Sequence, residues 1–113
     1  MAMHIVEKQV GSVTVLELSG RITLGEESVQ LRNKLKALLT GKPRLVLDLG
    51  NVSYIDSAGL GTLVASYTTA ANQGVRMVLA NLTKRLQEQL SITKLVTVFE
   101  VYDSVDDAVK SFS

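Results

Sequence analysis

Apolar and polar residues alternate along the chain in short segments, and their period changes repeatedly between that of a strand and that of a helix. Residues 4–10 and 13–19 are two β-prone segments joined at Gly11 and Ser12, a pair suited to a two-residue hairpin turn. We therefore expect the first two strands to form an antiparallel hairpin.

The next two segments predict a helix followed by a buried strand. Over residues 26–40 most apolar side chains lie three or four positions apart, the period of an amphipathic helix, and Gly41 and Pro43 end it. Residues 45–49 are almost continuously apolar, which is typical of a short strand covered on both faces of its sheet. We expect this strand at the centre of the sheet.

The second half of the sequence continues the alternation of helices and strands. Residues 57–73 predict a second amphipathic helix ended by Gly74, and residues 75–80 another core strand. A short helix carrying Leu82, Leu86 and Leu90, a last strand over residues 96–101 and a C-terminal helix over residues 104–112 follow. The order ββαβαβαβα predicts one α/β domain, residues 1–113, in which a mixed, largely parallel β-sheet is layered with about four helices.

The composition narrows the classes of function. The sequence has no cysteine, a net charge of +1 and 4% aromatic residues, which argues against disulfides, thiol chemistry and direct nucleic-acid binding. We find neither a secretory signal pattern nor an apolar stretch long enough to span a bilayer, so we expect a cytoplasmic protein without membrane insertion. The cations Lys84, Arg85 and Lys94 could attract an acidic partner, and a solvated helix face explains them equally well.

Residues for catalysis are also missing. A serine hydrolase needs a base beside its nucleophile, and the only histidine is His4, in the predicted hairpin. The phosphate-binding pattern GxxxxGK[ST] is absent, and Gly59-Leu60-Gly61 lacks the third glycine of a dinucleotide fingerprint. Acidic pairs at 26–27 and 106–107 fall in first turns of predicted helices, where the helix dipole explains them. We therefore expect no enzyme, no catalytic residue, no cofactor and no metal site.

One segment is unfavourable for the start of a helix, because it contains two glycines. It is Tyr-Ile-Asp-Ser-Ala-Gly-Leu-Gly, residues 54–61. Each of its two glycines costs about 0.8 to 1 kcal/mol relative to alanine inside a helix. One explanation is structural: Ser57 or Asp56 caps the helix, and the glycines allow close packing on the sheet. The other is functional, because a bare helix N-terminus with a hydroxyl at Ser57 is a surface that another protein can approach closely.

The same segment resembles a known family. The sequence resembles the signature of STAS domains, specifically the bacterial anti-sigma factor antagonists, at residues 45–49, at Val52 and at residues 55–61. In addition, Gly20-Arg21-Ile22 resembles the turn that leaves the second strand of these domains. This resemblance implies a binding module whose serine, here Ser57, is phosphorylated by an anti-sigma factor with serine kinase activity. The unmodified form would bind that kinase and so release a sigma factor, and a protein serine phosphatase would restore it.

The resemblance and the segment together give the expected site. Ser57 is the predicted phosphorylation site, and the predicted partner-binding residues are Arg21, Thr23, Asp56, Ser57, Ala58, Gly59, Leu60 and Gly61. Thr23 departs from the family, whose members often carry an acidic residue there. This departure leaves open a STAS subunit that is never phosphorylated and serves in a transporter or signalling complex. A second alternative is a nucleotide or small anion bound at the amides that follow Ser57.

Overall fold

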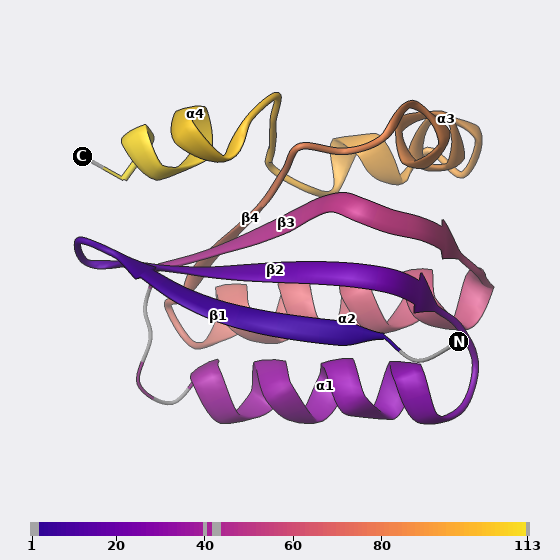
Figure 1. The fold of residues 1–113 in the computed structure, drawn as a ribbon, viewed down its shortest axis with the longest axis horizontal. Helices are drawn as coiled ribbons and strands as arrows, with labels where there is room; N and C mark the ends of the chain where they lie inside the picture. Colours follow the sequence, from indigo (N-terminus) through magenta and orange to yellow (C-terminus); the bar gives the residue numbers. More distant parts are fainter. Residues whose placement is uncertain (1–2, 40, 42–43, 113) are drawn as a thin grey trace.

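The computed structural model describes residues 3–39, 41 and 44–112, and its five described strands form one sheet (Figure 1). The strands lie in the order of the chain, with β1 antiparallel to β2 and every later pair parallel. Their bounds are β1 His4–Val10, β2 Val13–Ile22, β3 Arg44–Ile55, β4 Arg76–Ala80 and β5 Val101–Tyr102. The predicted mixed, largely parallel sheet is confirmed.

The N-terminal hairpin turns at Gly11 and Ser12, as predicted. Val10 pairs with Val13 across the turn, and Gly11 has a φ of +61°, a left-handed conformation that glycine adopts without strain. This hairpin leaves β1 at the edge of the sheet and places β2 beside β3.

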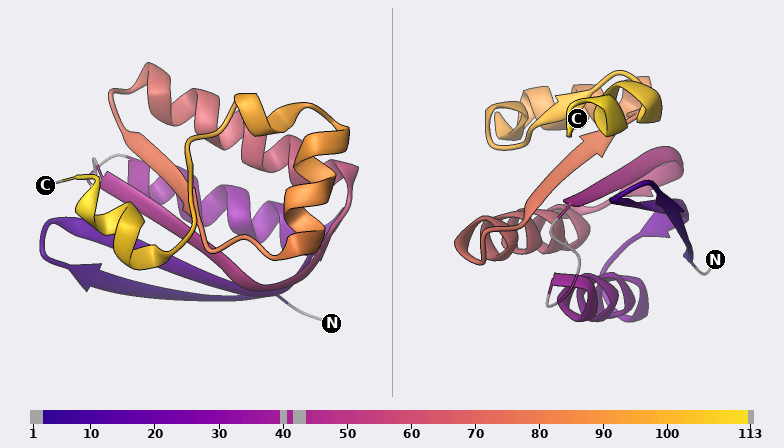
Figure 2. Two further views of the ribbon diagram at one scale, coloured as in Figure 1. Left: turned by 90° about the horizontal axis from the view of Figure 1, so that it is seen from above. Right: turned by 90° about the vertical axis from the view of Figure 1, so that its left-hand side faces the viewer.

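The helices lie on both sides of the sheet. Their bounds are α1 Glu26–Leu39, α2 Ser57–Asn72, α3 Lys84–Ile92 and α4 Val105–Lys110. Figures 1 and 2 show α1 and α2 under one face and α4 over the other, with α3 on the same side as α4. The expected helix end at Thr40 and the proline at position 43 lie outside the described residues.

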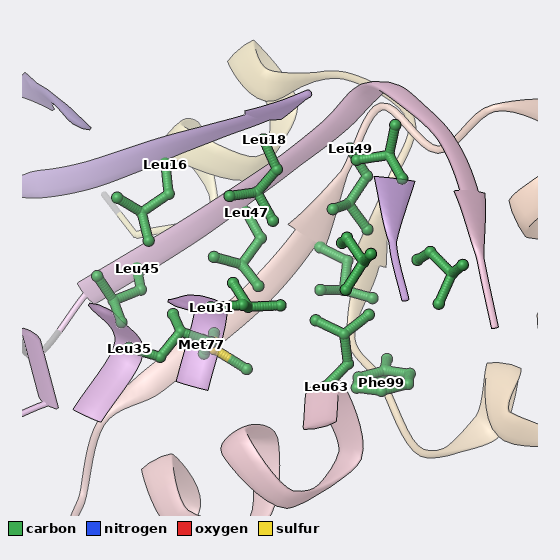
Figure 3. Packing of buried hydrophobic residues seen from close by; sticks show 14 of the residues in the cluster. Leu16, Leu18, Leu31, Leu35, Leu45, Leu47, Leu49, Leu63, Met77 and Phe99 are labelled. Carbon is green, nitrogen blue, oxygen red and sulfur yellow. The ribbon is translucent and has the colours of Figure 1, made fainter. Parts of the chain in front are cut away.

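The larger hydrophobic core lies between the sheet and the helices α1 and α2, and α3 contributes Leu86 and Leu90 to it. Alternate side chains of β3 point into it (Figure 3), whereas Val46 belongs to a second cluster under α4. β3 is therefore buried on both faces and is the central strand, as its apolar sequence predicted. Fully buried members of the larger core include Leu16, Leu31, Leu45, Leu47, Leu49, Leu63 and Leu79.

The prediction of a strand over residues 96–101 is wrong. A 3-10 turn, Leu95–Thr97, occupies the first part of this segment, and pairing with β4 begins only at Val101. Phe99 is buried and meets Tyr67 edge to face at 5.1 Å between ring centroids, while the Glu100 N–H donates to the Tyr67 hydroxyl at 3.2 Å. The apolar side chains of this segment thus cover the core from a loop instead of forming a ladder.

The C-terminal helix begins where its sequence predicted and ends earlier. Ser104 is its N-cap, and the Ser104 side chain accepts a hydrogen bond from the Asp107 N–H at 3.1 Å. The helix ends at Lys110, so Phe112 lies beyond it and packs against the second core cluster.

Candidate functional site

The candidate site lies where β3 ends and α2 begins. Asp56 has an extended backbone and is the N-cap of α2, and its Oδ1 accepts a hydrogen bond from the Gly59 N–H at 2.8 Å. Of the two caps that the sequence allowed, the structure has Asp56. Ser57 is consequently the first residue of the helix, and its side chain is not needed as a cap.

Asp56 also joins the start of α2 to the loop between β2 and α1. Its Oδ2 accepts a hydrogen bond from the Leu24 N–H at 2.8 Å, and its own N–H donates to the Ile22 carbonyl at 3.2 Å. The backbone donors of Gly59 and Leu24 lower the pKa of the Asp56 carboxyl below its usual value. A carboxylate at neutral pH therefore holds these two chain segments together.

This geometry predicts a pH-dependent contribution of Asp56 to stability. Because the folded-state pKa is lowered, the stabilisation is present above the ordinary value of 3.8 and is lost as the pH falls through the folded-state pKa. In Asp56→Asn the side-chain oxygen can still accept one N–H, whereas the amide nitrogen cannot accept the other. We expect Asp56→Asn to be less stable than the wild type near pH 7, with the difference shrinking as the pH falls below the ordinary value of 3.8.

Urea unfolding at several pH values measures this difference. Asp103→Asn is the matched control, because Asp103 is an exposed carboxylate to which no group in the described residues donates a hydrogen bond. A stability gap between Asp56→Asn and the wild type that stayed constant over this pH range would contradict the assignment.

Ser57 is exposed at the tip of α2. Within the part of the chain that the structure describes, no group hydrogen-bonds its hydroxyl. Ala58 beside it is half-buried and adds little bulk. The hydroxyl is therefore accessible to another protein, and none of the residues that the structure describes hydrogen-bonds it as a base would.

The two glycines of the segment have different roles, which the sequence could not separate. A Cβ at Gly59 would lie 2.3 Å from the Ile22 carbonyl oxygen and 2.9 Å from Cγ2 of Ile55, so only glycine lets the first turn of α2 pack on the sheet. A Cβ at Gly61 would meet nothing within 4 Å. The packing explanation thus accounts for Gly59, and Gly61 leaves an open, exposed patch on the helix.

Alanine at these two positions should change stability in opposite directions. Gly59→Ala forces backbone and side chains apart and should destabilise the fold by about 1 to 3 kcal/mol. Gly61→Ala adds a methyl group in open space and should stabilise the helix by up to about 1 kcal/mol. Urea unfolding of both variants tests this, and a Gly59→Ala protein as stable as the wild type would show that the contact at Ile22 relaxes at no cost.

Leu60 belongs to the core and not to the predicted surface. It is 7% exposed and packs among the buried residues of the larger cluster. Gly59 is buried against Ile22, so it too shapes the site without presenting a side chain. Both residues position the exposed part of α2, and a partner would meet Ser57 and Gly61.

The loop between β2 and α1 brings the other predicted residues to the same end of the sheet. The Thr23 hydroxyl donates to Oε1 of Glu27 at 2.7 Å, and the Thr23 carbonyl accepts the Ser28 N–H at 3.2 Å. Thr23 therefore stabilises the start of α1. Arg21 is exposed, and its guanidinium carbon lies 5.2 Å from the centroid of the Tyr54 ring.

Leu24 is a surface residue that the sequence analysis missed. Its side chain is 77% exposed although its N–H is fixed by Asp56. A single exposed leucine is ordinary on a protein surface, so the interest of Leu24 lies in its position beside the Asp56 cap. The only signal in the sequence is one apolar residue within the polar loop that precedes α1, and it could not be linked to a site 32 residues away.

The structure weakens the prediction of an anion site at the amides after Ser57. The Gly59 N–H is paired with the Asp56 carboxylate, and the Leu60 N–H donates to the Asp56 carbonyl at 2.9 Å. A bound phosphate would meet this fixed negative charge at the place where the helix would otherwise attract it. Within the described residues no group of three or more potential ligands could hold a metal ion. No helix there has the length and hydropathy of a membrane span.

Comparisons with known proteins agree over nearly the whole chain. The STAS domain family model matches residues 4–108. The anti-sigma-B factor antagonist of Bacillus subtilis (strain 168) is 32% identical over 101 residues, which cover 89% of this chain and 92% of that protein.

Two solved structures show the same fold. An anti-sigma factor antagonist from Mycobacterium paratuberculosis has a TM-score of 0.79 at 23% identity, covering 97% of this chain and 93% of that one. The Bacillus cell fate determinant SpoIIAA in its phosphorylated form has a TM-score of 0.73 at 16% identity, covering 97% of this chain and 100% of that one.

Proposed function

We propose that this chain, which belongs to the STAS domain family, is an anti-sigma factor antagonist that binds its partner through the exposed start of α2 and the loop before α1. The observation that carries the proposal is the accessible Ser57 at the tip of a helix held in place by Asp56. Around it lie the open Gly61 and the exposed Leu24. We call these three residues, Leu24, Ser57 and Gly61, the docking surface.

The partner in this proposal is an anti-sigma factor with serine kinase activity. The unmodified domain binds it and frees the sigma factor that it held, which regulates transcription. Phosphorylation of Ser57 by the same partner ends the binding, and a protein serine phosphatase restores it. In this proposal the domain acts by binding, and its Ser57 hydroxyl is the group that the partner kinase modifies.

The charge of a phosphate explains why the switch acts on docking and not on folding. Phosphorylation adds about −1.5 to −2 charges near neutral pH. The helix dipole favours a negative charge at the start of α2 by about 0.3 to 1 kcal/mol, whereas the neighbouring Asp56 carboxylate repels it, so the two effects on the free domain nearly offset. At a closed interface the same charge loses its hydration without gaining a partner, and this costs several kcal/mol.

Displacement of a sigma factor tests the proposed function. The unmodified domain is titrated into a complex of a candidate anti-sigma kinase with its sigma factor, and free sigma factor is measured by size-exclusion chromatography. We expect release with the wild type and with Ser57→Ala, which keeps a small uncharged side chain. Sigma factor that stayed bound at every concentration of the wild type would contradict the proposal and favour the STAS assembly subunit, whose partner would be another protein.

A further inference from the structure

A second surface lies beside the docking surface, around the ring of Tyr54. The guanidinium carbons of Arg21 and Arg85 lie 5.2 and 5.7 Å from the centroid of this ring. Both distances are within the range of a cation–π interaction. Arg21 pairs with Tyr54 between β2 and β3, and Arg85 comes from α3, so three separate elements meet at one ring.

The position of Arg85 is fixed by the packing of α3. One turn further along the helix, Nε2 of Gln89 donates to the carbonyl of Ile55 at 2.6 Å, which anchors α3 to the residue next to Tyr54. Lys84 and Arg85 occupy the first turn of α3, which contains no acidic residue. Cations at this end of a helix oppose its dipole, so the fold gains nothing from their charge there.

The charges of this cluster are not neutralised within the described residues. Arg21 and Arg85 are both exposed, and neither has a carboxylate partner in that part of the chain. Lys8, Lys34 and Arg76, by contrast, each form an ion pair. Two like charges that are open to solvent therefore share one ring.

We propose that Arg21 and Arg85, oriented by Tyr54, bind an acidic segment of the anti-sigma factor. Guanidinium groups bind carboxylates through paired hydrogen bonds, and side chains oriented in advance lose less conformational entropy when they do so. Tyr54 is two residues before Asp56, which places this cluster at the same end of β3 as the docking surface. The inference rests on the proposed function, since it assigns a second contact for the same partner.

Charge reversal with a matched control tests this contact. The double variant Arg21→Glu/Arg85→Glu is compared with Lys36→Glu/Lys110→Glu, which changes the net charge equally at exposed lysines outside the cluster. The dissociation constant for the anti-sigma factor is measured by calorimetry at low and high salt, and unfolding curves establish that each variant folds. We expect the arginine variant to bind at least tenfold more weakly at low salt, with a smaller loss at high salt, and the lysine variant to bind as the wild type does.

A third variant tests the role of the ring. Tyr54→Leu keeps both arginines and removes the aromatic face, so we expect a loss of affinity of several-fold, smaller than that of the arginine variant. Equal losses in the arginine and lysine variants would overturn the inference, because net charge alone would then explain them.

Binding by Ser57→Asp distinguishes a failure of the acidic contact from a failure of the proposed function. Unchanged binding in the arginine variant, with binding lost in Ser57→Asp, would overturn the acidic contact and leave the docking surface in place. Unchanged binding in both variants would overturn both, as would a wild-type domain that bound none of the candidate anti-sigma factors.

Discussion

Ser57→Asp is expected to bind the anti-sigma factor roughly a hundredfold more weakly than the wild type. The substitution places a carboxylate on the exposed tip of α2, beside the Asp56 carboxylate, where a partner would exclude water from it. An unpaired charge at such an interface costs about 3 kcal/mol or more, and each 1.4 kcal/mol is a factor of ten in affinity. Calorimetric titration of the wild type and the variant measures the ratio.

The same variant should remain as stable as the wild type. Ser57 is exposed and does not cap α2, so its replacement breaks no contact of the core, and we expect the thermal midpoint to move by no more than about 3 °C. Ser57→Ala is the control, which should bind as the wild type does. Tight binding by Ser57→Asp, or weak binding caused by unfolding, would contradict a switch that works by charge at the docking surface.

Leu47→Ala should produce the largest loss of stability. Leu47 lies on the central strand, is 0% exposed and packs with the leucines of the larger core (Figure 3). Removing a buried leucine side chain costs about 2 to 5 kcal/mol, because the cavity left behind closes only in part. This is a large share of the roughly 5 to 15 kcal/mol that stabilises a typical domain. Thermal unfolding should show a midpoint about 10 °C lower or more.

Leu24→Ala is the control for Leu47→Ala, and it also tests the docking surface. The Leu24 side chain is 77% exposed, so the same substitution should change the free energy of unfolding by no more than about 0.5 kcal/mol. It should nevertheless weaken binding of the anti-sigma factor by about tenfold, because an exposed apolar side chain becomes buried in the complex. Loss of stability in Leu24→Ala without loss of affinity would place Leu24 outside the docking surface.

Most of the fold follows from local patterns in the sequence. The hairpin at Gly11, the two long amphipathic helices and the doubly buried strand around Leu47 all depend on the spacing of apolar residues and on turn residues. These signals lie within a few positions of one another, so no knowledge of distant contacts is needed. The N-cap at Ser104 is predictable for the same reason.

The segment before β5 shows where local patterns fail. Its apolar, β-prone residues predict a strand, yet Phe99 turns into the core against Tyr67, a residue from α2. That contact joins positions 32 residues apart, and no periodicity in the sequence encodes it. Tertiary packing has overridden the local preference for a strand.

The candidate site was predictable only in part, for the same reason. The motif marked the start of α2 as the candidate site and limited its N-cap to Asp56 or Ser57, because both depend on residues within one turn of the helix. Three other features of the site each link separate elements, so the motif could not show them. They are the hydrogen bond from Leu24 to Asp56, the close packing of Gly59 on Ile22, and the contact of Arg21 and Arg85 with the Tyr54 ring. Only the three-dimensional arrangement separates the glycine that packs from the glycine that is exposed.

Mapping the phosphorylated residue by mass spectrometry shows whether Ser57 is the residue that the partner modifies. The domain is incubated with the anti-sigma kinase and ATP beside the Ser57→Ala variant, whose accessible hydroxyl is gone. We expect one phosphate per wild-type chain, located on Ser57, and none on the variant. Equal phosphorylation of both proteins, with the group on Ser53 or Thr62, would contradict this expectation.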